Sequence, residues 1–183
     1  MTDHELHDTL NAAYDAAPKM DVHTHLRWRT PAATDAKNIV FYHMMDAEWH
    51  AAGMQGRAPD HRSEAWDDQH DWPALFAAAG AVAPRAGNTA MARALLAIGR
   101  DLYGVTHPRL DARFFSALDA AVRARGDAAA WTEQLFDRMR LQRVLTSSFG
   151  GRSDRDEFAG RVHQRMALAY ERDFALPPKY AQH

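Results

Sequence analysis

The chain contains no cysteine among its 183 residues. Disulfides, cysteine-ligated zinc sites and thiol nucleophiles are therefore excluded. It also lacks any run of lysine and arginine, and its formal net charge at pH 7 is only -2. Binding of nucleic acid or of an anionic membrane through general electrostatics needs a strongly basic surface, so we expect neither partner.

Long apolar runs are missing as well. No stretch approaches the roughly 18 apolar residues that a bilayer-spanning helix needs, and the N-terminus lacks a basic segment followed by an apolar one. We therefore expect a soluble, cytoplasmic protein. The G-x-S-x-G, P-loop and Rossmann glycine patterns are also absent, so nothing supports a serine hydrolase, a kinase or a dinucleotide enzyme.

What the chain does have is apolar residues at 46% and 11 histidines. That apolar content is enough for a proper core, and the length is most simply that of a single domain over residues 1–183. Helical periodicity dominates most of it. The pattern predicts helices over residues 4–17, 35–53, 72–80, 88–103, 108–125 and 127–140, with a polar surface loop at 54–71.

Two short segments predict strands instead, at residues 20–26 and 143–148. After the second, Ser153 and Asp156 resemble a capping box, which opens a helix with Phe158, Val162, Met166 and Tyr170 on its inner face. Strands separated by helices favour a parallel α/β fold. The fold we expect is mostly helical, with a first strand region at 1–30, a helical insertion at 34–140, and the second strand with its following helix at 141–175.

The most informative motif is Asp21-Val22-His23-Thr24-His25-Leu26. Side chains alternate faces along a strand, so His23 and His25 are expected on the same side, roughly 6.5 Å apart. Asp21 joins their polar face, and Met20, Val22 and Leu26 form the apolar one. Two imidazoles so placed predict a shared metal ion. The alternative is an exposed strand or turn with merely solvated histidines, because an H-x-H pattern is short and common.

Three segments together resemble the uronate isomerase (glucuronate isomerase) branch of the amidohydrolase superfamily. They are D-V-H-T-H-L at 21–26, F-Y-H-M-M-D-A-E-W-H-A-A-G-M at 41–54, and L-Q-R-V-L-T-S-S at 141–148 after a long helical insertion. The resemblance implies the start of a (β/α)8 barrel with a helical insertion between strands 1 and 2. It also implies metal-dependent isomerisation of a hexuronate such as glucuronate to the ketose, with His23 and His25 holding a divalent metal, commonly zinc.

The family also uses a catalytic tyrosine in the helix after the first strand. The alignment places Met44 at that position, so Tyr42 and His43 are the nearby candidates and the catalytic residue stays open. Arg27 and Arg29 follow the histidines, where a basic rim would suit the carboxylate of a sugar acid, although simple surface charge explains them equally well. Ser147 and Ser148 are expected at the same rim, the carboxyl ends of the strands.

A barrel of this kind needs about 200 residues at least. Because the insertion occupies much of this chain, we expect an incomplete barrel: a fragment, a truncated gene product, or a remnant stabilised by partners. Self-association or a partner chain completing the barrel is then expected, since an open sheet leaves unpaired edges. Two other functions stay open, a metal-dependent hydrolase of the same superfamily and a non-catalytic helical interaction module with a decayed site.

Overall fold

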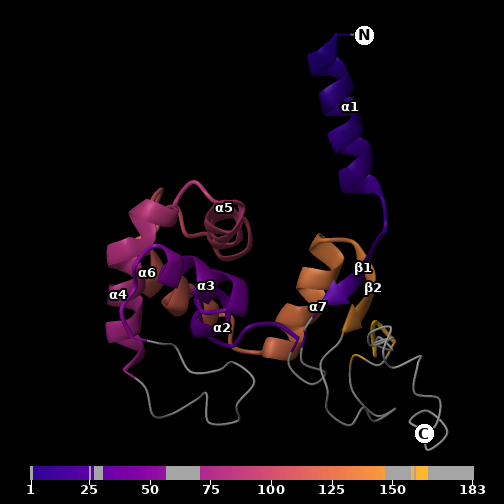
Figure 1. Cartoon of the computed structure of the whole chain (residues 1–183). Coiled ribbons are helices and arrows are strands. Elements are labelled where there is room, and N and C mark those ends of the chain that lie inside the picture. The colour runs from indigo at the N-terminus through magenta and orange to yellow at the C-terminus, as the bar shows by residue number, and fades with distance from the viewer. Residues whose placement is uncertain are drawn as a thin grey trace, which may run out of the picture. The chain divides into compact units, whose positions relative to one another are not determined.

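The computed structural model describes residues 2–24, 26, 31–56, 71–146, 158 and 160–164. The chain divides into two compact units, which we call unit 1 (residues 1–31 and 136–183) and unit 2 (residues 32–135). Most described residues are helical, and the described strands form one small parallel sheet in unit 1 (Figure 1). The expected mostly helical α/β class is confirmed. No helix of the described part is long and apolar enough to cross a membrane.

Unit 1 is built on its sheet. The elements in chain order are α1 (Asp3–Ala16), β1 (Lys19–Thr24), the last residues of α7 (Ala128–Arg138), β2 (Leu141–Thr146) and β3 (Val162–Gln164). The strand order is β1-β2-β3, and both strand pairs are parallel. Each strand therefore lies beside the next one along the chain, although a long helical segment separates β1 from β2.

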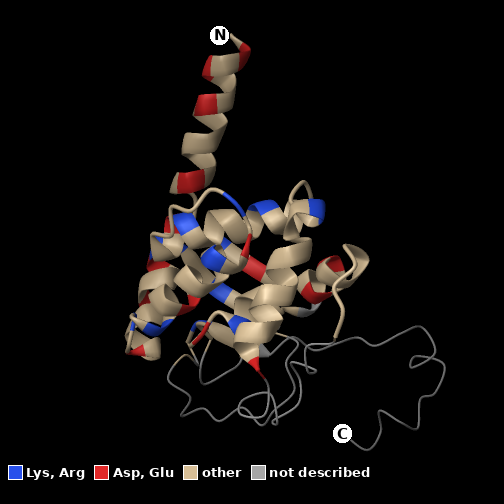
Figure 2. Ribbon diagram, turned by 90° about the vertical axis from the view of Figure 1, so that its left-hand side faces the viewer, with Lys and Arg blue, Asp and Glu red and all other residues tan. Residues whose placement is uncertain are grey.

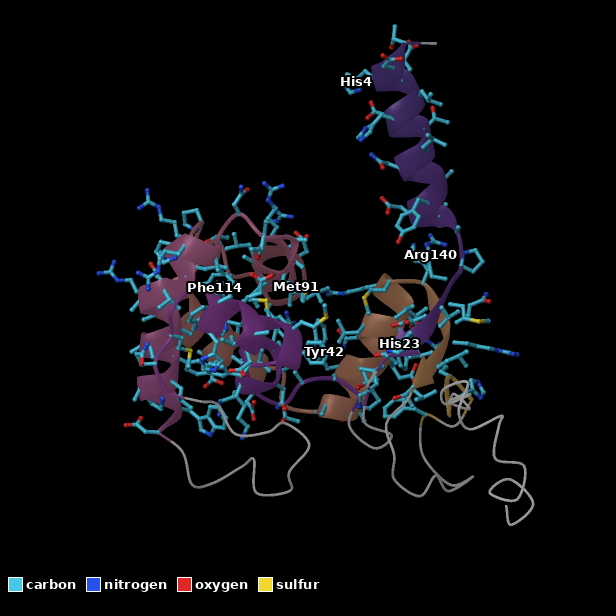
Figure 3. The ribbon with its side chains drawn as sticks, in the orientation of Figure 1. His4, His23, Tyr42, Met91, Phe114 and Arg140 are labelled. Carbon is cyan, nitrogen blue, oxygen red and sulfur yellow. The ribbon has the colours of Figure 1, made fainter. Side chains whose placement is uncertain are left out.

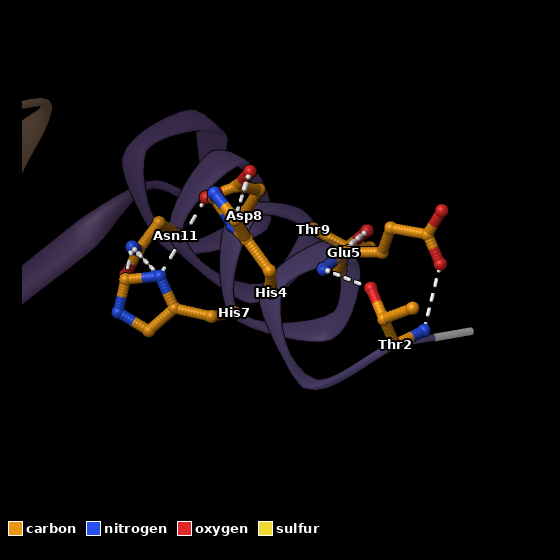
Figure 4. Close-up of polar contacts among 7 residues, drawn as sticks. All are labelled: Thr2, His4, Glu5, His7, Asp8, Thr9 and Asn11. Carbon is orange, nitrogen blue, oxygen red and sulfur yellow. Dashed lines mark hydrogen bonds and ion pairs between the residues drawn. The ribbon is translucent and has the colours of Figure 1, made fainter.

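The helix α1 begins with a capping box. The Thr2 hydroxyl accepts a hydrogen bond from the Glu5 backbone N–H, and the Glu5 carboxylate accepts one from the Thr2 N–H at 2.7 Å (Figure 4). The sequence explains the helix, but every residue of α1 is exposed, including its apolar stripe of Leu6, Leu10 and Tyr14. The charged residues of α1 are all acidic, as the red bands in Figure 2 show.

One face of the sheet supplies the buried apolar contacts of unit 1. Val144 is 1% exposed, its β3 partner Val162 is fully buried, and Phe158 contacts Phe136 of α7 edge to face at 6.2 Å. The helix expected through Phe158 to Tyr170 is wrong at Val162, because residues 162–164 are strand β3. Apolar residues four apart predict one face of a helix. Val162 belongs to that pattern, but it is buried in the structure as a residue of β3 that pairs with β2.

Helices are the secondary structure of unit 2 in its described part. Its elements are α2 (Lys37–Val40), α3 (His43–Ala51), α4 (Trp72–Ala86), α5 (Ala90–Ala97), the π-helix η2 (Ile98–Leu102), α6 (Ala112–Arg123) and most of α7. Asp71, Thr89 and Asp111 cap α4, α5 and α6 by accepting a hydrogen bond from a backbone N–H of the first turn. Such caps satisfy donors that a helix start leaves unpaired.

The single helix expected over 35–53 is wrong, because it breaks at Phe41 and Tyr42 into α2 and α3. Tyr42 adopts φ -53° and ψ 138°, which is not helical. The Val40 carbonyl accepts a hydrogen bond from the buried Trp49 indole N–H at 2.7 Å. A tertiary bond thus takes the place of a helical one, a change that apolar periodicity alone does not reveal.

The core of unit 2 is an aromatic cluster enclosed by tightly packed helices. Phe76 stacks on Phe41 at 5.7 Å, and Trp49 contacts Phe115 edge to face at 5.8 Å. The helices α4 and α6 approach so closely at Gly80 that an added Cβ there would lie 2.4 Å from the Ala112 backbone nitrogen. A larger residue at 80 would have to move backbone, so glycine is required for this packing.

Candidate functional site

The candidate site lies at the carboxyl ends of the parallel strands. β1 ends at Thr24, β2 at Thr146 and β3 at Gln164, and Thr24 pairs with Thr146, which in turn pairs with Gln164. Because parallel strands end on the same edge, all three ends lie together. In barrels and open α/β sheets this edge carries the ligand site.

His23 lies next to the last residue of β1, and its side chain is exposed (Figure 3). Its backbone N–H donates a hydrogen bond to the Asp21 carboxylate at 3.0 Å. Asp21 pairs with Val144 and Thr24 with Thr146, so β1 takes one more residue than β2 over this stretch. The strict alternation expected along β1 is therefore interrupted at Val22 and His23. Such bulges are common beside active sites, where they redirect a side chain.

The chain that follows β1 is fastened to the end of β2. Thr146 is fully buried, and its hydroxyl donates a hydrogen bond to the Leu26 carbonyl at 2.9 Å. Thr24 and Leu26 are therefore both held against the same residue of β2. This contact holds Leu26 at the end of β2.

The described structure adds one residue that the sequence reasoning missed, His163 of β3. Its imidazole is half-buried, and its Nε2 atom is buried without a hydrogen-bond partner among the described residues. A buried polar atom in that condition is uncommon. The helix predicted through residues 158–170 gives His163 no place on the sheet. A strand predicted over 162–164 would have placed a second imidazole there.

Several predicted site residues lie outside the described residues. These are His25, Arg27, Arg29, Ser147 and Ser148. Of the two catalytic candidates, Tyr42 is the half-buried residue that precedes α3 in unit 2, while His43 begins α3 and its side chain lies outside the described set.

The donor chemistry of the edge suits the predicted metal only in part. Within the described residues no group of three or more histidine, aspartate or glutamate side chains could hold a metal ion. His23 supplies one imidazole at the expected end of β1, and imidazole is a ligand that zinc prefers. The other predicted ligand, His25, lies outside the described part.

The groups with shifted pKa values described next lie in unit 2 and hold its helices in place. The hydrogen bond from His107, at 2.9 Å, and then the Phe114 backbone N–H lower the pKa of the Asp111 carboxyl. Burial raises the pKa of the Tyr103 phenol, against the opposing effect of its bond from the Trp131 indole at 3.3 Å. Both groups cap or bridge helices, and such structural pairs shift pKa values as catalytic ones do.

Comparison with known proteins adds no assignment. No model of a known protein family matches the chain. A search of curated proteins likewise finds no match.

Proposed function

We propose that unit 1 is the start of a uronate isomerase-like barrel and that the chain serves metal-dependent aldose–ketose isomerisation of a hexuronate such as glucuronate. The observation that carries the proposal is His23 at the carboxyl end of the first strand of a parallel sheet. The strands of that sheet are adjacent in chain order.

The topology of the described sheet is compatible with the start of a barrel. In a (β/α)8 barrel each strand lies beside the next one along the chain, whereas a doubly wound sheet reverses its order at a switch point. The order β1-β2-β3 of the described strands fits the first three strands of either fold. What supports the barrel is the helical unit 2, which lies in the connection between β1 and β2. A helical insertion at this point is what the resemblance to uronate isomerases implies.

The reaction requires a bound sugar acid and one proton carrier. The C2 hydrogen of the aldose moves to C1 as a proton, and a proton moves from O2 to O1, so the aldehyde becomes a hydroxyl and C2 becomes the carbonyl. A positioned base near pH 7 performs such transfers, and Tyr42 and His43 are the candidates for it. Arg27 and Arg29 would bind the carboxylate.

Within the described part, Asp21 and Thr146 act as positioning residues. Asp21 holds the His23 backbone at the bulge, and Thr146 holds the chain beyond it. His23 and His25 would hold the divalent metal, which we propose to be zinc. A bound divalent ion supplies polarisation of the sugar oxygens.

The test is incubation of the chain with glucuronate and galacturonate, followed by detection of the ketose. We expect product that is lost on chelation, restored by zinc, and abolished by His23→Ala. His4→Ala is the matched control, because His4 lies exposed on α1 and pairs with Asp8 (Figure 4).

Ketose formation that is unchanged by chelation and by His23→Ala would contradict the proposal. Absence of ketose under all metal conditions would contradict the isomerase activity of this chain. Metal-dependent hydrolysis in its place would favour the hydrolase alternative.

A further inference from the structure

Unit 2 contains a pocket whose lining residues all belong to unit 2. It lies between the α2–α3 segment and the α5–η2 segment and has a volume of about 220 Å³. Tyr42 and Met91, both labelled in Figure 3, come from its two sides, and Met45 and Leu95 are its buried members. Ala94 also lines the pocket but is exposed, which places it at the mouth.

The lining is almost entirely apolar. It includes no lysine, arginine, aspartate, glutamate or histidine. The amide nitrogen of Asn38, one of its polar groups, already donates a hydrogen bond to Asp35 at 2.8 Å. A charged group placed there would lose its water without gaining a charged partner, which costs on the order of several kcal/mol. The chemistry of the wall therefore selects an uncharged ligand.

The size of the pocket limits the ligand further. An apolar cavity of about 150 Å³ holds one benzene molecule, so this one suits a substituted benzene or an indole. Whole ligand pockets usually span about 300–1,000 Å³. We propose that this pocket binds the single uncharged aromatic ring of a small molecule.

The wall formed by Ile98 carries a second, independent sign of function. Ile98 begins the π-helix η2, and π-helical turns inside α-helices occur frequently at functional sites. The turn is held by a close contact, since an added Cβ on Gly99 would lie 2.5 Å from the Phe114 ring. A helix distorted and fixed at the edge of an apolar pocket indicates that the shape of this wall is specified.

This inference meets the proposed isomerase at Tyr42, which lines the pocket and is also one of the two candidate bases. Binding of an apolar ligand in the pocket would leave His43 as the candidate base. A hexuronate is anionic and rich in hydroxyl groups, so it is a poor occupant of this lining. The pocket would therefore take a different molecule. Ligand binding here needs neither His23 nor a metal, and each claim can fail while the other stands.

The sequence offers an unusually specific probe. The chain has two isoleucines, Ile39 and Ile98, and both line the pocket. Labelling the full chain with ¹³C at the isoleucine δ1 methyl groups gives two signals, each a direct reporter. We expect both signals to shift saturably on titration with toluene and with indole, with intermolecular nuclear Overhauser effects to the ligand. Benzoate, which matches toluene in size but carries a charge, should leave them unchanged.

A pair of surface variants completes the test. Ala94→Phe should close the mouth and weaken toluene and indole binding by at least tenfold, because its ring occupies the same space. Ala117→Phe is the matched control, since Ala117 is an exposed residue of α6 outside the pocket lining. Circular dichroism establishes that both variants are folded.

Three results would overturn the inference. Isoleucine signals that stay fixed with every neutral ligand would mean a closed pocket or one filled by the chain itself. Equal shifts with benzoate would contradict the apolar selection. Equal binding by Ala94→Phe and Ala117→Phe would place the ligand elsewhere.

Discussion

Asp111 makes two interactions at the start of α6. One carboxylate oxygen accepts a hydrogen bond from the Phe114 backbone N–H at 2.9 Å, and the other accepts one from His107 at 2.9 Å. Asp111→Ala removes both, and loss of an N-cap costs about 0.5–2 kcal/mol. Asp111→Asn keeps a capping oxygen and should cost less. Urea denaturation of the two variants at pH 7 measures the difference, and equal losses would contradict the capping role.

The same residue predicts a pH dependence with a definite sign. The folded pKa of Asp111 is lowered from its ordinary value of 3.8, so its ionised form stabilises the fold. That contribution is present above pH 3.8 and is lost as the pH falls through the folded pKa. The stability advantage of the native chain over Asp111→Asn should therefore shrink below about pH 4. Denaturation curves between neutral and acid pH follow it, and a constant difference would contradict it.

At the scale of elements, the sequence predicts those whose signals are local. The periodicity and caps that mark α1, α6 and α7 lie within or beside the segments themselves. α1 and α7 form within two residues of their expected limits, whereas α6 begins at Ala112, four residues later than expected. The break between α2 and α3 depends instead on the Trp49 indole reaching the Val40 carbonyl. β3 depends on pairing with β2, and three residues are too short for a periodic signal.

The candidate site likewise combines features that local sequence predicts with features that depend on strand pairing. The position of His23 on a strand could be predicted because the H-x-H pattern belongs to a segment with alternating polar and apolar residues. The bulge at Val22 and His23 could not, since a register shift arises between strands. His163 could not be predicted either, because its position on the sheet follows from the pairing of β3.

Gly99 offers a direct test of η2. An added methyl group would lie 2.5 Å from Phe114 Cζ and 2.9 Å from Cε2, closer than side chains pack. Gly99→Ala should therefore destabilise unit 2 by about 1–3 kcal/mol, the usual cost of overpacking. Gly87→Ala is the matched control, because its Cβ would meet Ala83 O at an ordinary 3.5 Å. Thermal unfolding measures both, and equal stability of the two variants would contradict the close contact.

At the scale of the whole molecule, exposed apolar residues predict association. Met20 and Val22 of β1 are 54% and 62% exposed, and within the described part β1 pairs on one edge alone. If the sheet is the start of a barrel, this face and edge are covered in the working protein. Sedimentation velocity should show association that grows with concentration.

The association should depend on β1 specifically. Val22→Lys should shift the distribution toward monomer, because a charged side chain on an edge strand opposes pairing. Met44→Lys, at a residue of α3 that is 49% exposed, is the control and should leave it unchanged. A monodisperse monomer of the native chain at all concentrations would contradict the expectation.

The metal site at the end of β1 is the central claim, and a titration of the metal-free chain with Co²⁺ or Zn²⁺ tests it most directly. We predict one ion per chain, bound at least about tenfold more weakly after His23→Ala or His25→Ala, because each change removes a ligand. His4→Ala, on exposed α1, should bind as the native chain does. Binding that is unchanged by both His23→Ala and His25→Ala would contradict the account.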